Sequence, residues 1–150
     1  CVGGGLLLAA ACDLRIAADN TRFAIPEVDL GIPLAWGGIP RLVREVGPAV
    51  TRELVMTCRP FDAVEAQSLG MVNRVVPLDR LRIETDELAA SLAAKPVSLL
   101  RTTKRQVQEA TEDMVSTQSG WTASAHLAVA LADPEARAAA SAYLAGRGGR

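Results

Sequence analysis

Aromatic residues, histidine and an excess of one charge are all scarce in this sequence, and each shortage argues against a class of function. Aromatic side chains make up 3% of the 150 residues, and the formal net charge is −1. Without a basic stripe interleaved with aromatics, binding to nucleic acid is not expected. No stretch approaches about 20 uncharged apolar residues, so no membrane-spanning helix is expected either. The core must be built from alanine, leucine and valine.

Cysteine and histidine also lack any spacing typical of a metal site. The three cysteines form no CxxC pair, and we expect Cys1, Cys12 and Cys58 to be reduced, buried, small apolar residues of a cytoplasmic protein. The single histidine, His126, lies in a predicted helix beside apolar neighbours, where a surface or interface role is favoured over catalysis. We therefore expect no metal site.

What the sequence does have is a run of three glycines at residues 3–5, followed by an apolar run that predicts a short buried helix over residues 5–12. Glycines let the backbone turn tightly and approach a ligand closely. The first N–H groups of a helix lack internal partners, and with the helix dipole they suit an oxygen that carries negative charge. No phosphate-loop lysine or GxGxxG spacing is present, which argues against a nucleotide. Two interpretations stay open: a site for a polarised thioester carbonyl, or a packing device.

The segment 25–33 is predicted to be a loop of fixed geometry, because Pro26 and Pro33 remove backbone donors and restrict the residues before them. Such loops often carry function. Glu27 in this loop is either a solvated carboxylate or an acid/base group. If the loop is extended, Asp29 shares a face with Glu27, and the two carboxylates could act as a pair.

Short strands are predicted over residues 14–18, 21–24 and 71–76, with helices over 39–46 and from Pro48 to about residue 57. Asp62 and Glu65 form a capping-box pattern for a short helix that Gly70 ends. From residue 78 onward the pattern is purely helical, over about 79–94, 97–110, 112–132 and 134–144. We therefore divide the chain into a mixed region 1–77, a helical region 78–145 and a flexible tail 146–150.

Several motifs, in order and at matching spacing, resemble the crotonase superfamily, also called the enoyl-CoA hydratase/isomerase superfamily. They are Gly3-Gly4-Gly5, Cys12-Asp13-Leu14-Arg15-Ile16-Ala17, Phe23-Ala24-Ile25-Pro26-Glu27-Val28, Leu30-Gly31-Ile32-Pro33, Gly37-Gly38 with Arg41-Leu42, and Gly70-Met71-Val72-Asn73-Arg74-Val75-Val76. The resemblance implies an α/β fold: a ββα spiral core, followed by a C-terminal helical region. Because the chain opens on Cys1, two residues before the glycines, we expect it to be the C-terminal part of a longer protein, with the spiral core incomplete at its N-terminus.

The resemblance also implies roles for individual residues. Gly4 matches one backbone donor of an oxyanion hole for a thioester oxygen, and the second donor is expected before residue 1. Glu27, after Pro26, matches one of the two glutamates that hydratases use, whereas Leu7 stands at the position of the other. Trp36 replaces a usually small residue and either shapes the acyl pocket or packs on the fold.

The function implied is that of an acyl-CoA-processing enzyme of fatty-acid metabolism, an enoyl-CoA hydratase or isomerase. Leu7 argues against efficient hydration and leaves isomerisation open, and the alternative is a catalytically silent acyl-CoA-binding protein. Coenzyme A would be part of the substrate, with no separate cofactor, and a homotrimer or hexamer is implied. The residues expected at the substrate, besides catalytic Gly4 and Glu27, are Gly3, Gly5, Leu7, Pro26 and Trp36. Asp13 is expected to bond Arg15 or a backbone amide.

Overall fold

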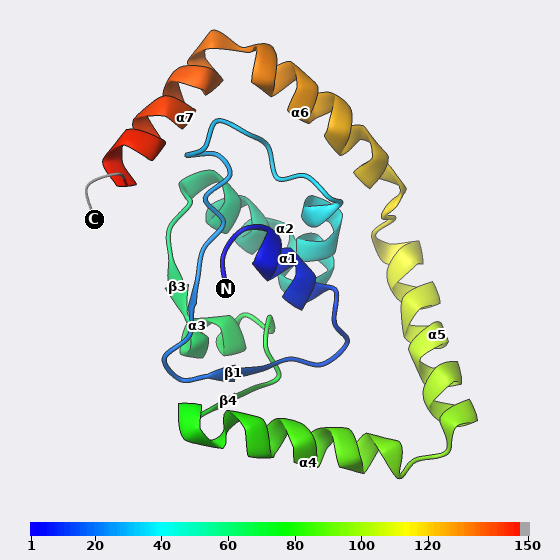
Figure 1. Ribbon diagram of the computed structural model, residues 1–150. Helices are drawn as coiled ribbons and strands as arrows, with labels where there is room; N and C mark the ends of the chain where they lie inside the picture. Colours follow the sequence, from blue (N-terminus) through cyan, green and yellow to red (C-terminus); the bar gives the residue numbers. More distant parts are fainter. Residues whose placement is uncertain (148–150) are drawn as a thin grey trace.

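The computed structural model describes residues 1–147 and shows a mixed βα region followed by helices (Figure 1). The elements are, in chain order, α1 (Gly4–Ala10), β1 (Ile16–Ala18), β2 (Arg22–Phe23), α2 (Gly38–Thr57), β3 (Phe61–Asp62), α3 (Ala63–Ser68), β4 (Arg74–Val76), η1 (Leu78–Arg80), α4 (Leu81–Ala93), α5 (Val97–Met114), η2 (Gln118–Thr122), α6 (Ala123–Ala132) and α7 (Pro134–Arg147). The predicted order of short strands and helices up to residue 77 is confirmed, with shorter strands than expected.

The strands form two small sheets. β1 and β4 pair in parallel, with Ala17 opposite Val75, and β2 and β3 pair antiparallel. The aromatic rings of Phe23 and Phe61 stack across the second pair, with centroids 5.3 Å apart. A parallel bridge joins Val2 to Ala24 and so places the glycine turn beside the end of β2.

Glycines and caps set the helix boundaries in this region much as the sequence predicts. α2 is two helical halves that meet at a kink at Gly47, where φ is +79° and Pro48 follows. The side chain of Asp62 caps α3 by accepting a hydrogen bond from the Glu65 N–H at 2.8 Å. Gly70, with φ +82°, then turns the chain toward β4.

The core lies among α1, α2, α3 and the loop that follows β2. Its fully buried large side chains are Leu6, Ile25, Leu42 and Leu54. Two cysteine predictions are wrong, because Cys1 and Cys12 are exposed and only Cys58 is buried. A cysteine is often buried, but its thiol stays exposed where no other element packs over it.

The helices after β4 lie around the periphery of the core, as an arc from α4 to α7 (Figure 1). The continuous helix predicted over residues 112–132 is wrong: α5 ends at Met114, Val115 is extended, and a short 3-10 turn precedes α6. A helical pattern of side chains does not by itself show where the backbone breaks. The predicted tail is helical as far as Arg147, and residues 148–150 lie outside the described part.

Close backbone approaches and ion pairs connect this arc to the core. Gly31, with φ +69°, lies directly against the Ala136 carbonyl of α7, and a Cβ at Gly120 would lie 3.1 Å from Gly37 Cα. The guanidinium of Arg44 on α2 pairs with Glu112 of α5 and donates to the Val115 carbonyl at 2.8 Å. The arc therefore contacts the 25–37 loop as well as α2.

Candidate active site

The glycine turn presents one backbone donor without a partner. Gly3 has φ +54° and donates to the Ala24 carbonyl at 2.9 Å, and Gly5 donates to the Val2 carbonyl at 3.0 Å. Among the backbone hydrogen bonds of residues 1–147, none is donated by the Gly4 N–H. Gly4 is the first residue of α1, where an orphan N–H and the helix dipole favour a negatively polarised oxygen.

Glu27 reaches back to this turn. A Cβ on Gly3 would lie 2.8 Å from Glu27 Oε1, so a side chain at this position would displace the carboxyl group. The other oxygen, Oε2, is buried and accepts no hydrogen bond within the described part of the chain. Burial raises the pKa of the Glu27 carboxyl, and the backbone hydrogen bond that it accepts opposes this only in part. A carboxyl with a raised pKa is suited to proton transfer near neutral pH.

The indole of Trp36 lies against the next glycine, Gly4. A Cβ on Gly4 would lie 2.7 Å from Trp36 Cζ3, so the six-membered ring of the indole rests against Gly4. Trp36 exposes 77% of its surface and adopts a left-handed backbone, with φ +56°. The two consecutive glycines therefore each accommodate one side chain of the 25–37 loop, Glu27 and Trp36.

The remaining residues predicted to lie at the substrate differ from one another in burial and contacts. Gly5 is exposed, and a Cβ there would meet nothing within 4 Å. Pro26 is half-buried, and its carbonyl accepts from the Leu30 N–H at 3.0 Å. Leu7 belongs to the buried core, where its Cδ1 would lie 2.8 Å from a Cβ on Gly38. The structure thus brings Gly3, Gly4, Glu27 and Trp36 together and turns Leu7 toward the core, while Pro26 lies beside Glu27 in the loop.

Two acidic residues, Asp13 and Asp29, have surroundings that differ from those predicted from the sequence. The 27–31 segment forms turns rather than an extended strand, and Asp29 is exposed, so the condition for a Glu27–Asp29 pair is not met. Asp13 pairs with Lys104 of α5 at 2.5 Å, so the expected bond to Arg15 or to a backbone amide is wrong. Arg15 instead pairs with Glu45 and donates to the Cys12 carbonyl, 2.6 Å away, just past the end of α1. Glu45 and Lys104 are far from Arg15 and Asp13 in the sequence, so the sequence alone did not indicate either ion pair.

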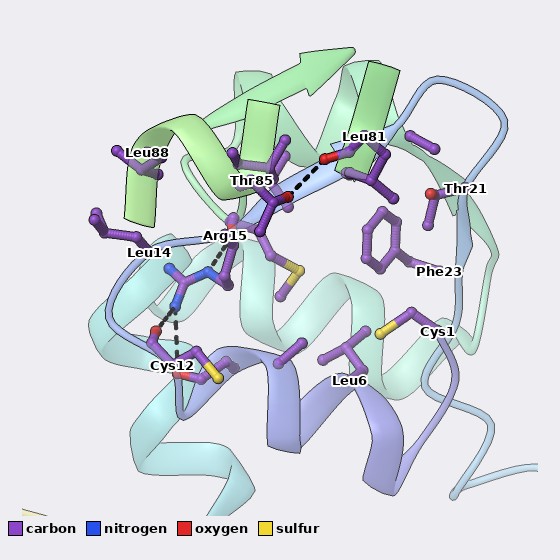
Figure 2. A pocket seen from close by; sticks show the side chains of 17 residues that line it. Cys1, Leu6, Cys12, Leu14, Arg15, Thr21, Phe23, Leu81, Thr85 and Leu88 are labelled. Carbon is purple, nitrogen blue, oxygen red and sulfur yellow. Dashed lines mark hydrogen bonds between the residues drawn. The ribbon is translucent and has the colours of Figure 1, made fainter. Parts of the chain in front are cut away.

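Two cavities lie near this turn, and neither is lined by Gly3, Gly4 or Glu27. The first, of about 380 Å³, lies between α1, β1 and α4 and is mostly apolar, with the Arg15 guanidinium in one wall (Figure 2). The second, of about 410 Å³, lies between the 28–40 segment and α6. His126 is exposed and borders this second cavity, a position that its sequence context alone did not indicate.

The described residues contain neither a membrane-spanning helix nor a group of side chains suited to a metal ion. No helix within residues 1–147 is both long and apolar enough to cross a membrane. Over the same residues, no three side chains of His, Cys, Asp or Glu come together as a metal would require.

Comparisons with known proteins bear on this geometry. The family model described as enoyl-CoA hydratase/isomerase matches residues 1–144. A probable enoyl-CoA hydratase of Mycobacterium bovis is 41% identical over 115 residues, which are 77% of this chain and 45% of that protein. A short-chain-enoyl-CoA hydratase of Clostridioides difficile is 41% identical over 76% of this chain and 74% of its own length. The crystal structure of an enoyl-CoA hydratase/isomerase from Pseudoalteromonas atlantica T6c matches 97% of this chain and 58% of that one, with a TM-score of 0.86 at 26% identity. The chain thus spans about half the length of several proteins that it matches.

Proposed function

The chain belongs to the enoyl-CoA hydratase/isomerase family, and from this premise we propose that the protein processes acyl-CoA thioesters in fatty-acid metabolism. The fold is that of the family's solved structures. Coenzyme A is then part of the substrate, and no further cofactor is needed for the reaction proposed here. The relatives' names and the family match support this class of substrate, and the glycine turn supports the chemistry.

One observation carries the proposal: an unpartnered N–H and a buried carboxyl meet at the same glycine turn. The Gly4 N–H is free to hold the thioester oxygen, and Glu27 lies against the preceding residue, Gly3. A fixed donor of this kind stabilises the negative charge that develops on the oxygen as an enolate forms. Loss of one such donor raises a barrier by about 2.7–4 kcal/mol, so Gly4 is proposed as a catalytic residue.

Glu27 is proposed as the acid/base group. As a carboxylate it takes a proton from the carbon next to the thioester of a 3-enoyl group, and the electron pair moves onto the thioester oxygen. The protonated Glu27 then returns the proton to the far end of the resulting dienolate, which gives the conjugated 2-enoyl product. One carboxyl group is sufficient for this isomerisation, because the proton removed is the proton returned.

Hydration would require a second acid/base group in this account, and Leu7 cannot supply it. Leu7 is 7% exposed and packed in the core. The same observation favours a second candidate function, a catalytically silent acyl-CoA-binding protein that retains the Gly4 site for affinity. We rank isomerisation first because the Glu27 carboxyl is held, without a hydrogen-bond partner for Oε2 in the described chain, at the turn that would bind the thioester.

The surroundings of this site suggest roles for other residues and for assembly. Gly3 and Gly5 shape the turn, and Pro26 and Trp36 bring the loop against it. The helices of the arc leave apolar side chains in solvent, and a homotrimer or a hexamer in the cytoplasm would cover them. Leu99, Met114 and Val129 are examples, each more than 60% exposed.

The test compares two carboxylates in the intact protein. With 3-butenoyl-CoA as substrate, Glu27→Gln is expected to lower kcat by about 10²- to 10⁴-fold, the range typical of a lost acid/base group. The matched control is Asp29→Asn, an exposed carboxylate two residues away, which should leave kcat unchanged. Formation of the conjugated enoyl thioester is followed by absorbance, and crotonyl-CoA is assayed in parallel for hydration.

The outcomes separate the two candidates. Full turnover by Glu27→Gln would contradict the role given to Glu27, and binding of acyl-CoA without turnover by the natural protein would favour the silent binder. Because burial raises the pKa of Glu27, the acid limb of the kcat/KM profile should lie above the ordinary glutamate range, with activity lost as pH falls through it. An acid limb at the ordinary glutamate pKa would contradict this assignment.

A further inference from the structure

Trp36 is unusual in two respects that composition does not explain. It is a large apolar side chain with 77% of its surface exposed, in a chain with only two tryptophans. Its backbone is also left-handed, with φ +56°, a conformation that L-residues with bulky side chains rarely adopt. Glycine at this position would relieve both the exposure and the strain. Strained backbone of this kind gathers at ligand clamps and active sites.

The left-handed backbone places the indole where it meets the candidate thioester site. Cζ3 and Cη2 would lie 2.7 and 3.3 Å from a Cβ on Gly4, so the benzo edge is in contact with the first residue of α1. An oxygen that accepts a hydrogen bond from the Gly4 N–H is therefore no more than about 8 Å from this ring, given ordinary bond lengths and a bond of about 2.9 Å. The acyl carbons nearest the thioester are therefore within reach of the indole.

The exposed surface of the indole leaves room for a second flat group. Aromatic rings prefer offset stacking or edge-to-face contact with other π systems. The dienolate of the proposed isomerisation, its conjugated enoyl product and an aryl group are all flat next to the thioester. A saturated acyl chain carries hydrogens on both sides of its carbon skeleton, has no π face and makes a poorer contact. Gly37, which follows with φ +66°, adds no side chain next to Trp36.

We propose that Trp36 is a specificity-determining residue that favours acyl groups with a flat, unsaturated or aryl portion next to the thioester over saturated ones. This inference rests on the proposed function, since it needs an acyl-CoA at Gly4. It does not rest on turnover, because it concerns the relative affinity for two acyl groups.

The test measures dissociation constants in the intact protein by calorimetry, with benzoyl-CoA as the flat probe and butanoyl-CoA as the saturated one. Trp36→Leu is expected to reduce the preference for benzoyl-CoA roughly three- to tenfold, the range that aromatic contact energies imply. Trp36→Phe, which keeps a flat face, should retain most of the preference. Met114→Ala, which removes another exposed apolar side chain, is the matched control and should leave the ratio unchanged.

A second variant separates recognition from folding. Trp36→Gly should unfold at the same temperature as the natural protein or a higher one, because it relieves the left-handed strain, and yet lose the preference for benzoyl-CoA. If both probes bind and no Trp36 variant changes the ratio, the inference is overturned. A change in oligomeric state in Trp36 variants with an unchanged ratio would also overturn it, in favour of a subunit contact. If neither probe binds the natural protein, the proposed function itself fails.

Discussion

The two parts of this chain use similar apolar composition in opposite ways. Among the described residues, every buried apolar residue lies between Leu6 and Val72. By contrast, α4, α5 and α6 contain no buried residue among those described, although α6 is mostly alanine, leucine and valine. The elements within residues 3–72 pack against one another, and the helices α4 to α7 lie around them (Figure 1).

The contrast shows that apolar content alone does not place a residue in a core. Leu54 of α2 is 1% exposed because α2 lies against α1 and the other core elements, whereas Leu99 of α5 is 63% exposed because no described element covers that face. A helix that is apolar all round is normally buried, and α6 is not buried within one chain. The first region thus contains the buried core and the candidate site, while the arc offers apolar surface for other contacts.

The largest expected effect on stability tests the difference in burial between Leu54 and Leu99. Leu54→Ala should lower the free energy of unfolding by about 2–5 kcal/mol, because it leaves a cavity among close-packed side chains. The matched change Leu99→Ala should alter it by less than about 0.5 kcal/mol. Urea unfolding of the intact protein measures both, with sedimentation to follow any change in assembly. Similar losses for the two variants would show that the arc is as tightly packed as the core.

A smaller effect is expected where the two regions touch. Gly31→Ala combines left-handed strain with a collision between the new Cβ and the Ala136 carbonyl, whereas Gly47→Ala has the strain alone, since nothing lies within 4 Å. We expect about 1–3 kcal/mol of destabilisation for Gly47→Ala, because its φ of +79° and ψ of 166° lie in a region that is nearly restricted to glycine, and a larger loss for Gly31→Ala. Hydrogen exchange should also show faster exchange in α7 for Gly31→Ala only. Equal exchange in both variants would mean that Gly31 does not hold α7.

The smallest effect concerns the Arg44–Glu112 ion pair, one of the ion pairs between the regions. The Arg44 guanidinium is the main cause that lowers the pKa of Glu112 from 4.5 to about 2, with help from the Thr117 N–H. A carboxyl whose pKa is depressed by folding stabilises the folded state above its unfolded pKa. This contribution is lost as pH falls from about 4.5 through about 2. Stability measured over this range should fall less steeply in Glu112→Gln than in the natural protein. Superimposable profiles would show that the pair contributes nothing to the attachment of α5.

Short-range signals made the glycine turn, the caps and the helix kink predictable. The Gly3–Gly5 run, the Asp62 cap and the break at Gly47 each depend on a few neighbouring residues, which the sequence places together. The helix break at Val115 was missed, because no proline or glycine marks it. Glu112 accepts from the Thr117 N–H at 2.8 Å while it binds Arg44, and such a tertiary contact has no local signature.

By itself, the sequence determined the family, the glycine turn and the proline-bounded loop that carries Glu27. Only the tertiary structure decided that Glu27 and Trp36 meet Gly3 and Gly4, and that Leu7 faces the core instead. The physical reason is the sequence distance between the residues that each contact joins. Turns and caps are set by backbone preferences within a few residues, whereas the contact of a carboxyl or an indole with a helix start more than 20 residues earlier is set by the packing of the whole core.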